Sequence, residues 1–278
     1  MRKQLMINAL LGICWLTTWA QPQNYNALKE QAKAYYEQKE YIKSIECYEK
    51  AIDELKGTEY ESLVPTVRNS IAINNLYLGV AAIKEKDFST AKLYLDNALA
   101  DAKPDSKTYY TANSWMGQWN SIQALNIRLN NGDYQKAIQF SLEAEHFFDL
   151  ANEPEKRLSE QLSRSSSLLE LLRNDEAEAL LNQIISECNG ITTRRFILGR
   201  AKYQLGGIEL ASERFQSAIQ HFEKSYDICI RESAKDAKTW ARLSAQKLYS
   251  LYSTNVPDNN KSDLWKKRAD ELEPQSSK

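Results

Sequence analysis

The chain has 278 residues, of which 42% are hydrophobic and 26% charged, and its formal net charge is -1. These values are ordinary for a folded soluble chain, and the near-neutral charge excludes a general attraction to nucleic acid or to anionic membranes. The sequence contains only 9 glycines and 6 prolines. A β-rich protein of this size needs many turns marked by Gly and Pro, whereas long helices need few. The composition therefore favours an all-α fold.

Residues 1–20 have the plan of a secretory signal peptide. Arg2 and Lys3 form a basic start, residues 5–19 are mostly apolar and uncharged, and Ala20 provides a small residue where a signal peptidase would cleave. The apolar stretch is shorter than the about 20 residues of a membrane-spanning helix. We therefore expect export to the bacterial cell envelope, periplasmic or secreted, and no later membrane span. Cleavage would leave 34 basic and 37 acidic residues, a formal charge of -3.

Two alternatives for this segment stay open at the sequence level. It could remain as an uncleaved anchor, or Cys14 could carry a lipid, although Ile13 stands where a small residue is expected. The remaining chain contains Cys47, Cys188 and Cys229, an odd number without a CxxC pair. We interpret these three as buried residues that act as small apolar side chains, while one disulfide among them remains possible.

A local pattern recurs five times along residues 21–253. It consists of an aromatic residue, then Ala or Ser three residues later, then usually an apolar residue followed by Ala or Ser again. The copies begin at Tyr41, Phe88, Tyr134, Glu176 and Phe215, and the copy at Glu176 is weak. A short polar break precedes each copy, which is typical of a tight turn between two helices.

This periodicity predicts five helical hairpins and a helical end. We expect the hairpins at residues 24–57, 64–103, 107–151, 155–189 and 193–232. A further helix at residues 235–253 should pack on the last hairpin. Residues 254–278 should then hold a polar loop, a capping helix at residues 262–272 and a frayed tail. The capping helix would present one apolar side, made of Leu264, Trp265, Ala269 and Leu272.

The repeated pattern resembles the tetratricopeptide repeat (TPR). The second copy matches best, with Leu78, Gly79 and Ala82 in its first helix, and Phe88, Ala91, Leu95 and Ala98 in its second. The third copy departs in its first helix and the fourth in both helices. The resemblance implies an all-α fold, a right-handed superhelical solenoid of stacked antiparallel helix pairs. It also implies that the first helix of each pair lines a concave surface.

The candidate binding site follows from that implied concave surface. Trp, Tyr and Arg dominate binding hot spots, and the first helices carry several of them among apolar residues. We expect a groove with an Arg-bearing end that takes an extended peptide or a helix of another protein. The alternative is that these side chains are ordinary core between long helices. The groove residues would be Leu76, Tyr77, Val80, Trp119, Ile122, Asn126, Arg164, Arg200 and Tyr203.

The sequence carries no recognised catalytic or phosphate-binding motif. The only histidines, His146 and His221, fall in the second helices of different hairpins, so a histidine metal pair is not expected. We predict no catalytic, cofactor or metal residues. The terminal-carboxylate grip of co-chaperones of the resembled family is also not expected, because Tyr77 stands where an Asn is needed.

These observations predict a non-catalytic scaffold for protein–protein interaction. One alternative is a sensory or regulatory module that signals through a separate membrane protein. A second alternative is an enzyme whose site lies inside a helical array. The sequence does not identify the partner or the oligomeric state.

Overall fold

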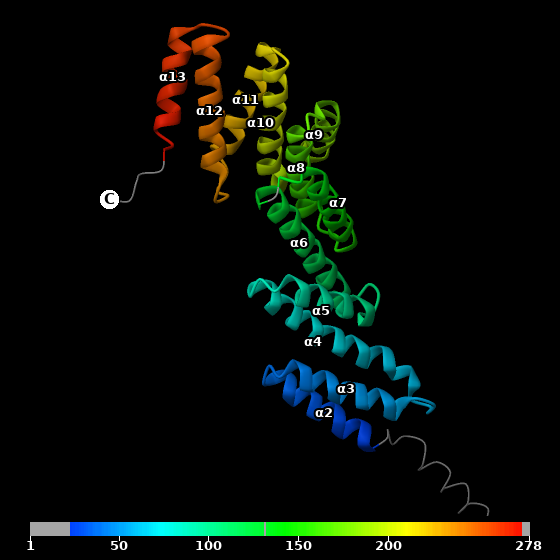
Figure 1. The fold of residues 1–278 in the computed structure, drawn as a ribbon. Coiled ribbons are helices and arrows are strands. Elements are labelled where there is room, and N and C mark those ends of the chain that lie inside the picture. The colour runs from blue at the N-terminus through cyan, green and yellow to red at the C-terminus, as the bar shows by residue number, and fades with distance from the viewer. Residues whose placement is uncertain (1–22, 131, 274–278) are drawn as a thin grey trace, which may run out of the picture. The chain divides into compact units, whose positions relative to one another are not determined.

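The regular structure of the described residues is helical throughout. A computed structural model describes residues 23–130 and 132–273, which form twelve α-helices and two short 3-10 helices (Figure 1). The expected signal peptide, residues 1–20, lies outside the described residues. Two compact units divide the chain, residues 1–119 and residues 120–278, with the boundary inside one helix. The predicted division at residues 21–253 and 254–278 stays a prediction.

The first unit contains two complete helix pairs and the start of a third. From α2 to α5, each helix packs against the next one along the chain. The helices are α2 (Gln23–Glu37), α3 (Tyr41–Leu55), η1 (Glu61–Leu63), α4 (Val64–Lys84), α5 (Phe88–Asp101) and the first half of α6 (Lys107–Asn130).

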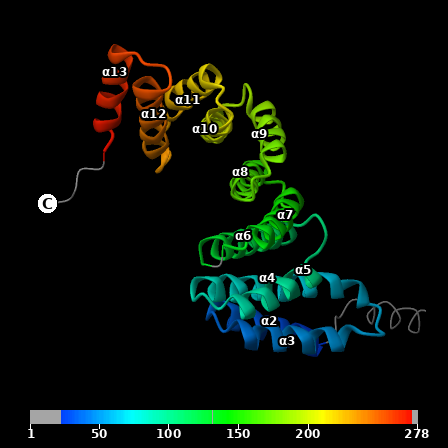
Figure 2. The same cartoon turned by 45° about the horizontal axis from the view of Figure 1, so that its top comes forward.

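The second unit continues the same alternation from the rest of α6. Successive helices lie antiparallel and side by side, as both ribbon views show for α10, α11, α12 and α13 (Figures 1 and 2). The helices are α7 (Tyr134–Leu150), α8 (Pro154–Glu170), α9 (Asn174–Cys188), η2 (Thr192–Arg194), α10 (Arg195–Ala211), α11 (Phe215–Cys229), α12 (Ala237–Thr254) and α13 (Asn259–Asp270).

Four of the five predicted hairpins are confirmed as packed helix pairs, the third is present as two successive helices, and one repeat register is corrected. The fourth second helix begins at Asn174, two residues before the copy predicted at Glu176. As a result Ala177 is fully buried, whereas Ala179, the predicted packing residue, is exposed. The misplacement arose because Asn174 occupies the position that Tyr or Phe marks in the other four second helices.

Small residues form the seam within each pair. The fourth residue of every second helix is at most 1% exposed, which allows the two backbones to approach closely. These residues are Ser44, Ala91, Ala137, Ala177 and Ala218. In two first helices a glycine faces a large side chain of the partner helix. A Cβ on Gly79 would lie 3.0 Å from Leu95, and one on Gly206 would lie 2.9 Å from Phe222.

The turns within pairs share one backbone geometry. The second residue before each second helix has a left-handed conformation with φ between 57° and 63°. In the turn after α8, the amide of Arg173 donates to the carbonyl oxygen of Leu168 at 2.9 Å, and the amide of Leu172 donates to that of Leu169 at 3.0 Å. This is the Schellman closure, which satisfies the last carbonyls of a helix. The left-handed residues are Lys39, Lys86, Gly132, Leu172 and Glu213.

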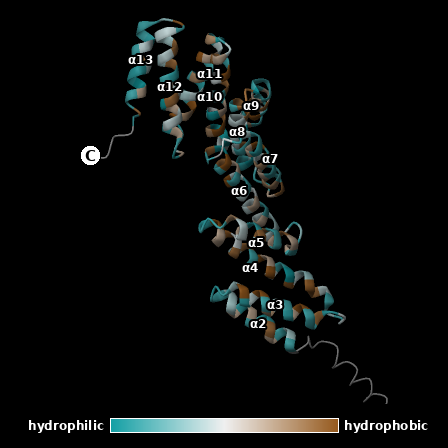
Figure 3. Ribbon diagram, viewed as in Figure 1, coloured by the Kyte–Doolittle hydropathy of each residue, from teal (hydrophilic) through white to brown (hydrophobic). Residues whose placement is uncertain are grey.

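The last helix begins earlier than predicted. Asp258 accepts a hydrogen bond from the amide of Lys261 at 3.1 Å, so α13 begins at Asn259 and not at residue 262. Trp265 and Ala269 are buried against α11 and α12 as expected, but Leu264 is 44% exposed. Figure 3 shows that most of α13 is hydrophilic, which suits the outer face of a terminal helix.

Candidate functional site

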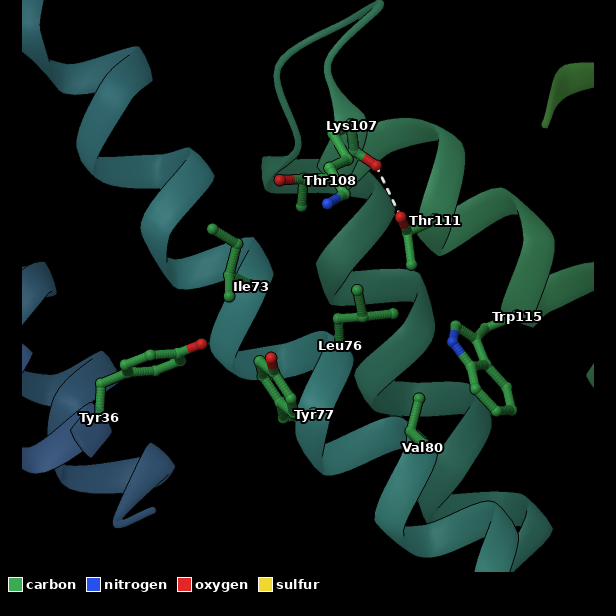
Figure 4. A pocket seen from close by; sticks show the side chains of 9 residues that line it. All are labelled: Tyr36, Ile73, Leu76, Tyr77, Val80, Lys107, Thr108, Thr111 and Trp115. Carbon is green, nitrogen blue, oxygen red and sulfur yellow. Dashed lines mark hydrogen bonds between the residues drawn. The ribbon is translucent and has the colours of Figure 1, made fainter. Parts of the chain in front are cut away.

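The first unit contains a pocket between its first helices. The pocket has a volume of about 470 Å³, and its lining is mostly apolar (Figure 4). Three of the predicted groove residues, Leu76, Tyr77 and Val80, line it. The other lining residues are Tyr36, Ile73, Lys107, Thr108, Thr111 and Trp115.

Helix α4 lines the pocket with the face opposite to the one that packs against α5. Ile73, Leu76, Tyr77 and Val80 recur at three- and four-residue spacing, so they share one face of the helix. Gly79 on the other face packs against α5. Because both faces are apolar, the helix shows little amphipathic contrast, which is expected when a helix is covered on one side and binds or packs on the other.

Helix α6 forms the opposite wall through one turn-spaced row. Lys107, Thr111 and Trp115 stand four residues apart, and Thr108 is buried beside them. The hydroxyl of Thr111 donates to the carbonyl oxygen of Lys107 at 2.7 Å (Figure 4). The sequence analysis did not include this row in the groove. Its i, i+4 spacing on a first helix is the signal that could have identified it.

Three tyrosine rings close the end of the pocket formed by α2. The rings of Tyr41 and Tyr77 stack with centroids 5.1 Å apart, and Tyr36 meets Tyr77 edge-on at 5.7 Å. The Tyr36 hydroxyl points toward Tyr77, as Figure 4 shows. A hydrogen bond to Tyr77, together with burial, raises the pKa of Tyr36 to about 12, so it stays a neutral donor at physiological pH. Tyr77 remains 46% exposed and available for contact.

Trp119 does not line this pocket. Its indole Nε1 donates to the carbonyl oxygen of Phe88 at 2.9 Å, and the Nζ of Lys92 lies 5.8 Å from the centroid of its ring. Both partners belong to α5, the second helix of the preceding pair. For Trp119 the structure favours packing between helices, the alternative considered for the groove residues.

The other five predicted groove residues belong to the second unit. Ile122 and Asn126 are half-buried on α6. Arg164 forms an ion pair with Glu145 of α7, with its Nε and Nη2 atoms 2.6 and 3.1 Å from the two carboxylate oxygens. Burial raises the pKa of Glu145, and Arg164 opposes that rise. Arg164 therefore serves to neutralise a buried carboxylate between α7 and α8.

Arg200 and Tyr203 surround an aromatic ring of α12. The ring of Tyr203 meets Trp240 edge-on at 5.2 Å and Phe222 at 5.5 Å, which places Tyr203 at the margin of the core. The guanidinium carbon of Arg200 lies 5.2 Å from the centroid of the Trp240 ring. The structure thus brings Arg200 and Tyr203 together. A groove continuous through both units stays a prediction.

Neither a metal-binding cluster nor a membrane-spanning helix occurs in the part of the chain that the structure describes. No group of three or more His, Cys, Asp or Glu side chains in residues 23–130 and 132–273 is arranged to hold a metal ion. None of the described helices combines the length and the apolar character needed to cross a bilayer.

No protein-family model and no curated protein sequence matches the chain. Solved structures do match. BtubC (BKLC) from P. vanneervenii is similar with a TM-score of 0.52 and 15% identity, over 86% of this chain and 96% of that chain. The C-terminal part of a TPR repeat-containing protein from Cytophaga hutchinsonii has a TM-score of 0.44 and 14% identity, over 89% and 96%. Combined with the tandem helix pairs and their small seam residues, the likeness to BtubC identifies the chain as an all-α protein with a TPR-like helical repeat fold.

Proposed function

We propose that the chain is a non-catalytic interaction scaffold that binds a segment of another protein in the pocket between α2, α4 and α6. The observation that carries the proposal is the pocket itself, an apolar cavity of about 470 Å³ walled by first helices. This volume lies within the range of pockets that enclose a ligand, about 300–1,000 Å³. Such a cavity has room for one or two large side chains of a peptide, which is the usual way in which an anchor residue binds.

The lining indicates the chemistry of that segment. Leu76, Val80 and Trp115 provide apolar walls, whereas Lys107 stands at one end, exposed and without a described carboxylate partner. A large apolar side chain would fill the walls and release water. An acidic residue next to that side chain would face Lys107. We therefore propose an apolar anchor beside an acidic residue as the segment that binds.

Photo-crosslinking tests this proposal in the native host. Benzoylphenylalanine is placed at position 77 of the full-length chain, and crosslinked peptides are mapped by mass spectrometry. The same probe at position 93 on α5 is the control, because Leu93 is 59% exposed but does not line the pocket. The proposal expects one partner segment from position 77, with an apolar residue beside an acidic one, and no such product from position 93.

A pair of charge substitutions completes the test. Val80→Glu places a carboxylate inside the pocket, whereas Leu93→Glu places one on an exposed surface. The crosslink should disappear in Val80→Glu and persist in Leu93→Glu, with both proteins folded by circular dichroism. An unchanged crosslink in the folded Val80→Glu variant would contradict the pocket as the binding site.

We also propose that the protein acts outside the cytoplasm, after cleavage of residues 1–20. The support is the basic start and the uncharged apolar stretch of the sequence. The mass of the protein purified from the native host tests it, since cleavage would make Gln21 the first residue. A retained Met1 in membrane fractions would favour an anchored protein and the regulatory alternative.

A further inference from the structure

Arg200 in the second unit occupies an unusual environment for a cation. Its guanidinium carbon lies 5.2 Å from the ring centroid of Trp240 on α12 and 5.9 Å from that of Phe196, one turn earlier on α10. Helices α10 and α12 are in contact with each other. The guanidinium thus lies near one aromatic ring of its own helix and one of the contacting helix α12.

This guanidinium has no anionic partner among the described residues. No carboxylate in residues 23–130 and 132–273 lies within ion-pairing distance of it, and its Nε is buried without an acceptor. Its two terminal nitrogens make no described hydrogen bond and are not fully covered. Removing a guanidinium from water without pairing it is costly, and cation–π contacts compensate only part of that cost.

The surrounding charges do not cancel this cation. Burial lowers the pKa of Arg200, while Cys229 and Asp236 oppose the shift and the positive charge of Arg128 adds to it. Arg128 itself is held by the backbone and hydroxyl oxygens of Ser163, each 3.1 Å from its Nη1. A second fixed cation therefore increases the positive potential around Arg200.

Arg164 on the neighbouring first helix differs from Arg200 in its pairing. Arg164 is also partly buried, but the guanidinium edge formed by its Nε and Nη2 is occupied by the carboxylate of Glu145. Arg200 has the same kind of planar fork with no carboxylate on it. A guanidinium fork matches the two oxygens of a carboxylate and can donate two parallel charge-assisted hydrogen bonds to them.

From this geometry we propose that Arg200, framed by Phe196 and Trp240, is a binding subsite for a carboxylate of a ligand. The subsite goes beyond the proposed function, because it lies in the second unit and does not use the pocket residues of α2, α4 and α6. The carboxylate could come from an acidic side chain or from a chain terminus. The two sources share the same recognition by the guanidinium.

Nuclear magnetic resonance of arginine side chains tests the subsite in the full-length protein. The Nε–Hε signal of Arg200 is assigned from its loss in Arg200→Lys and followed during titration. The probes are N-acetylglutamate α-amide for a side-chain carboxylate and N-acetylglycine for a chain terminus. The proposal expects a saturable shift at Arg200 with at least one of the two. The stronger probe identifies the source.

Three controls make the result decisive. N-acetylglutamine amide is the neutral match of the side-chain probe and should give no saturable shift. Arg231→Gln removes an exposed arginine of the same unit and should leave the titration unchanged, whereas Trp240→Leu should weaken it. A missing shift, an equal shift with the neutral amide, or saturation by inorganic phosphate alone would overturn the carboxylate subsite. None of these outcomes depends on the pocket of the first unit.

Discussion

Gly199 of α10 lies directly against the sulfur of Cys229 at the end of α11. A Cβ added to Gly199 would lie 2.6 Å from that Sγ and 3.1 Å from the Cγ2 of Ile228. The glycine therefore sets how closely the two helices of the fifth pair approach at this end. Gly206 has the same role two turns later, opposite Phe222.

The first prediction is that Gly199→Ala destabilises the protein. Overpacking of a core costs about 1–3 kcal/mol, which outweighs the gain of about 1 kcal/mol from replacing Gly by Ala in a helix. Adding Cys229→Ala removes the sulfur and should restore much of the lost stability. Urea unfolding of the single and double variants measures this coupling.

Gly207 supplies the matched control for this prediction. It is the neighbour of Gly206 on α10, but an added Cβ meets no atom within 4 Å. Gly207→Ala should therefore stabilise the protein by up to about 1 kcal/mol through helix propensity alone. Equal effects of Ala at positions 199 and 207 would contradict the close approach at Cys229.

The second prediction concerns the turn between α8 and α9. Leu172 is 83% exposed and holds a left-handed conformation with φ of 57°, which is unfavourable for a residue with a Cβ. Leu172→Gly should raise the free energy of unfolding by about 1 kcal/mol. Leu129, 71% exposed within α6, is the control, since Leu129→Gly should lower it by a similar amount. A loss of stability in both variants would contradict the turn geometry.

The sequence was sufficient to predict the helix pairs, because the residues that indicate them are close together and recur along the chain. An aromatic residue equivalent to Phe88 and a small residue equivalent to Ala91 recur in other pairs. Asp87 and Asp133 cap their second helices by accepting hydrogen bonds from the amides of Thr90 and Lys136. The fourth pair lacks the aromatic marker at Asn174. Leu172 closes the turn of this pair in a left-handed conformation. A leucine in the sequence does not indicate that conformation.

The candidate site was only partly predictable, because helical periodicity does not say which partner a face meets. Leu76, Tyr77 and Val80, three of the predicted groove residues, line a pocket of the first unit. Tryptophan is common in binding hot spots, yet the indole of Trp119 donates a hydrogen bond to a backbone carbonyl oxygen of α5. Arg164 was expected to be free for a ligand, but Glu145 lies 19 residues earlier and pairs with it only after α7 and α8 pack.

The third prediction concerns that buried pair. Arg164→Met should destabilise the protein by about 2–3 kcal/mol near neutral pH, since it leaves the Glu145 carboxylate buried without its cation. Arg173→Met is the control, because Arg173 pairs with Glu176 on the surface, and such pairs contribute about 0–1 kcal/mol. Chemical denaturation of both variants measures the difference.

The effect of Arg164→Met should also depend on pH. The folded pKa of Glu145 is raised above 4.5 by burial, and loss of Arg164 removes two influences that lower it. A carboxyl whose folded pKa is raised binds more protons in the folded state, so stability falls as pH rises from about 4.5 through the folded pKa. The destabilisation by Arg164→Met should therefore be smaller at pH 4.5 than at pH 7.5. A pH-independent difference from the wild type would contradict the assignment.

The fourth prediction is that Cys188 and Cys229 resist alkylation in the native protein. They end α9 and α11 at equivalent positions, and burial raises the pKa of each thiol from 9.0 to about 11. Because the thiolate is the reactive form, this rise alone should slow reaction with iodoacetamide about 100-fold relative to the urea-unfolded chain. Mass spectrometry measures the rate at each cysteine. A cysteine placed at exposed position 93 should react at similar rates in the native and unfolded states. Rapid labelling of Cys188 or Cys229 in the native protein would contradict the prediction and show that the ends of these helix pairs open.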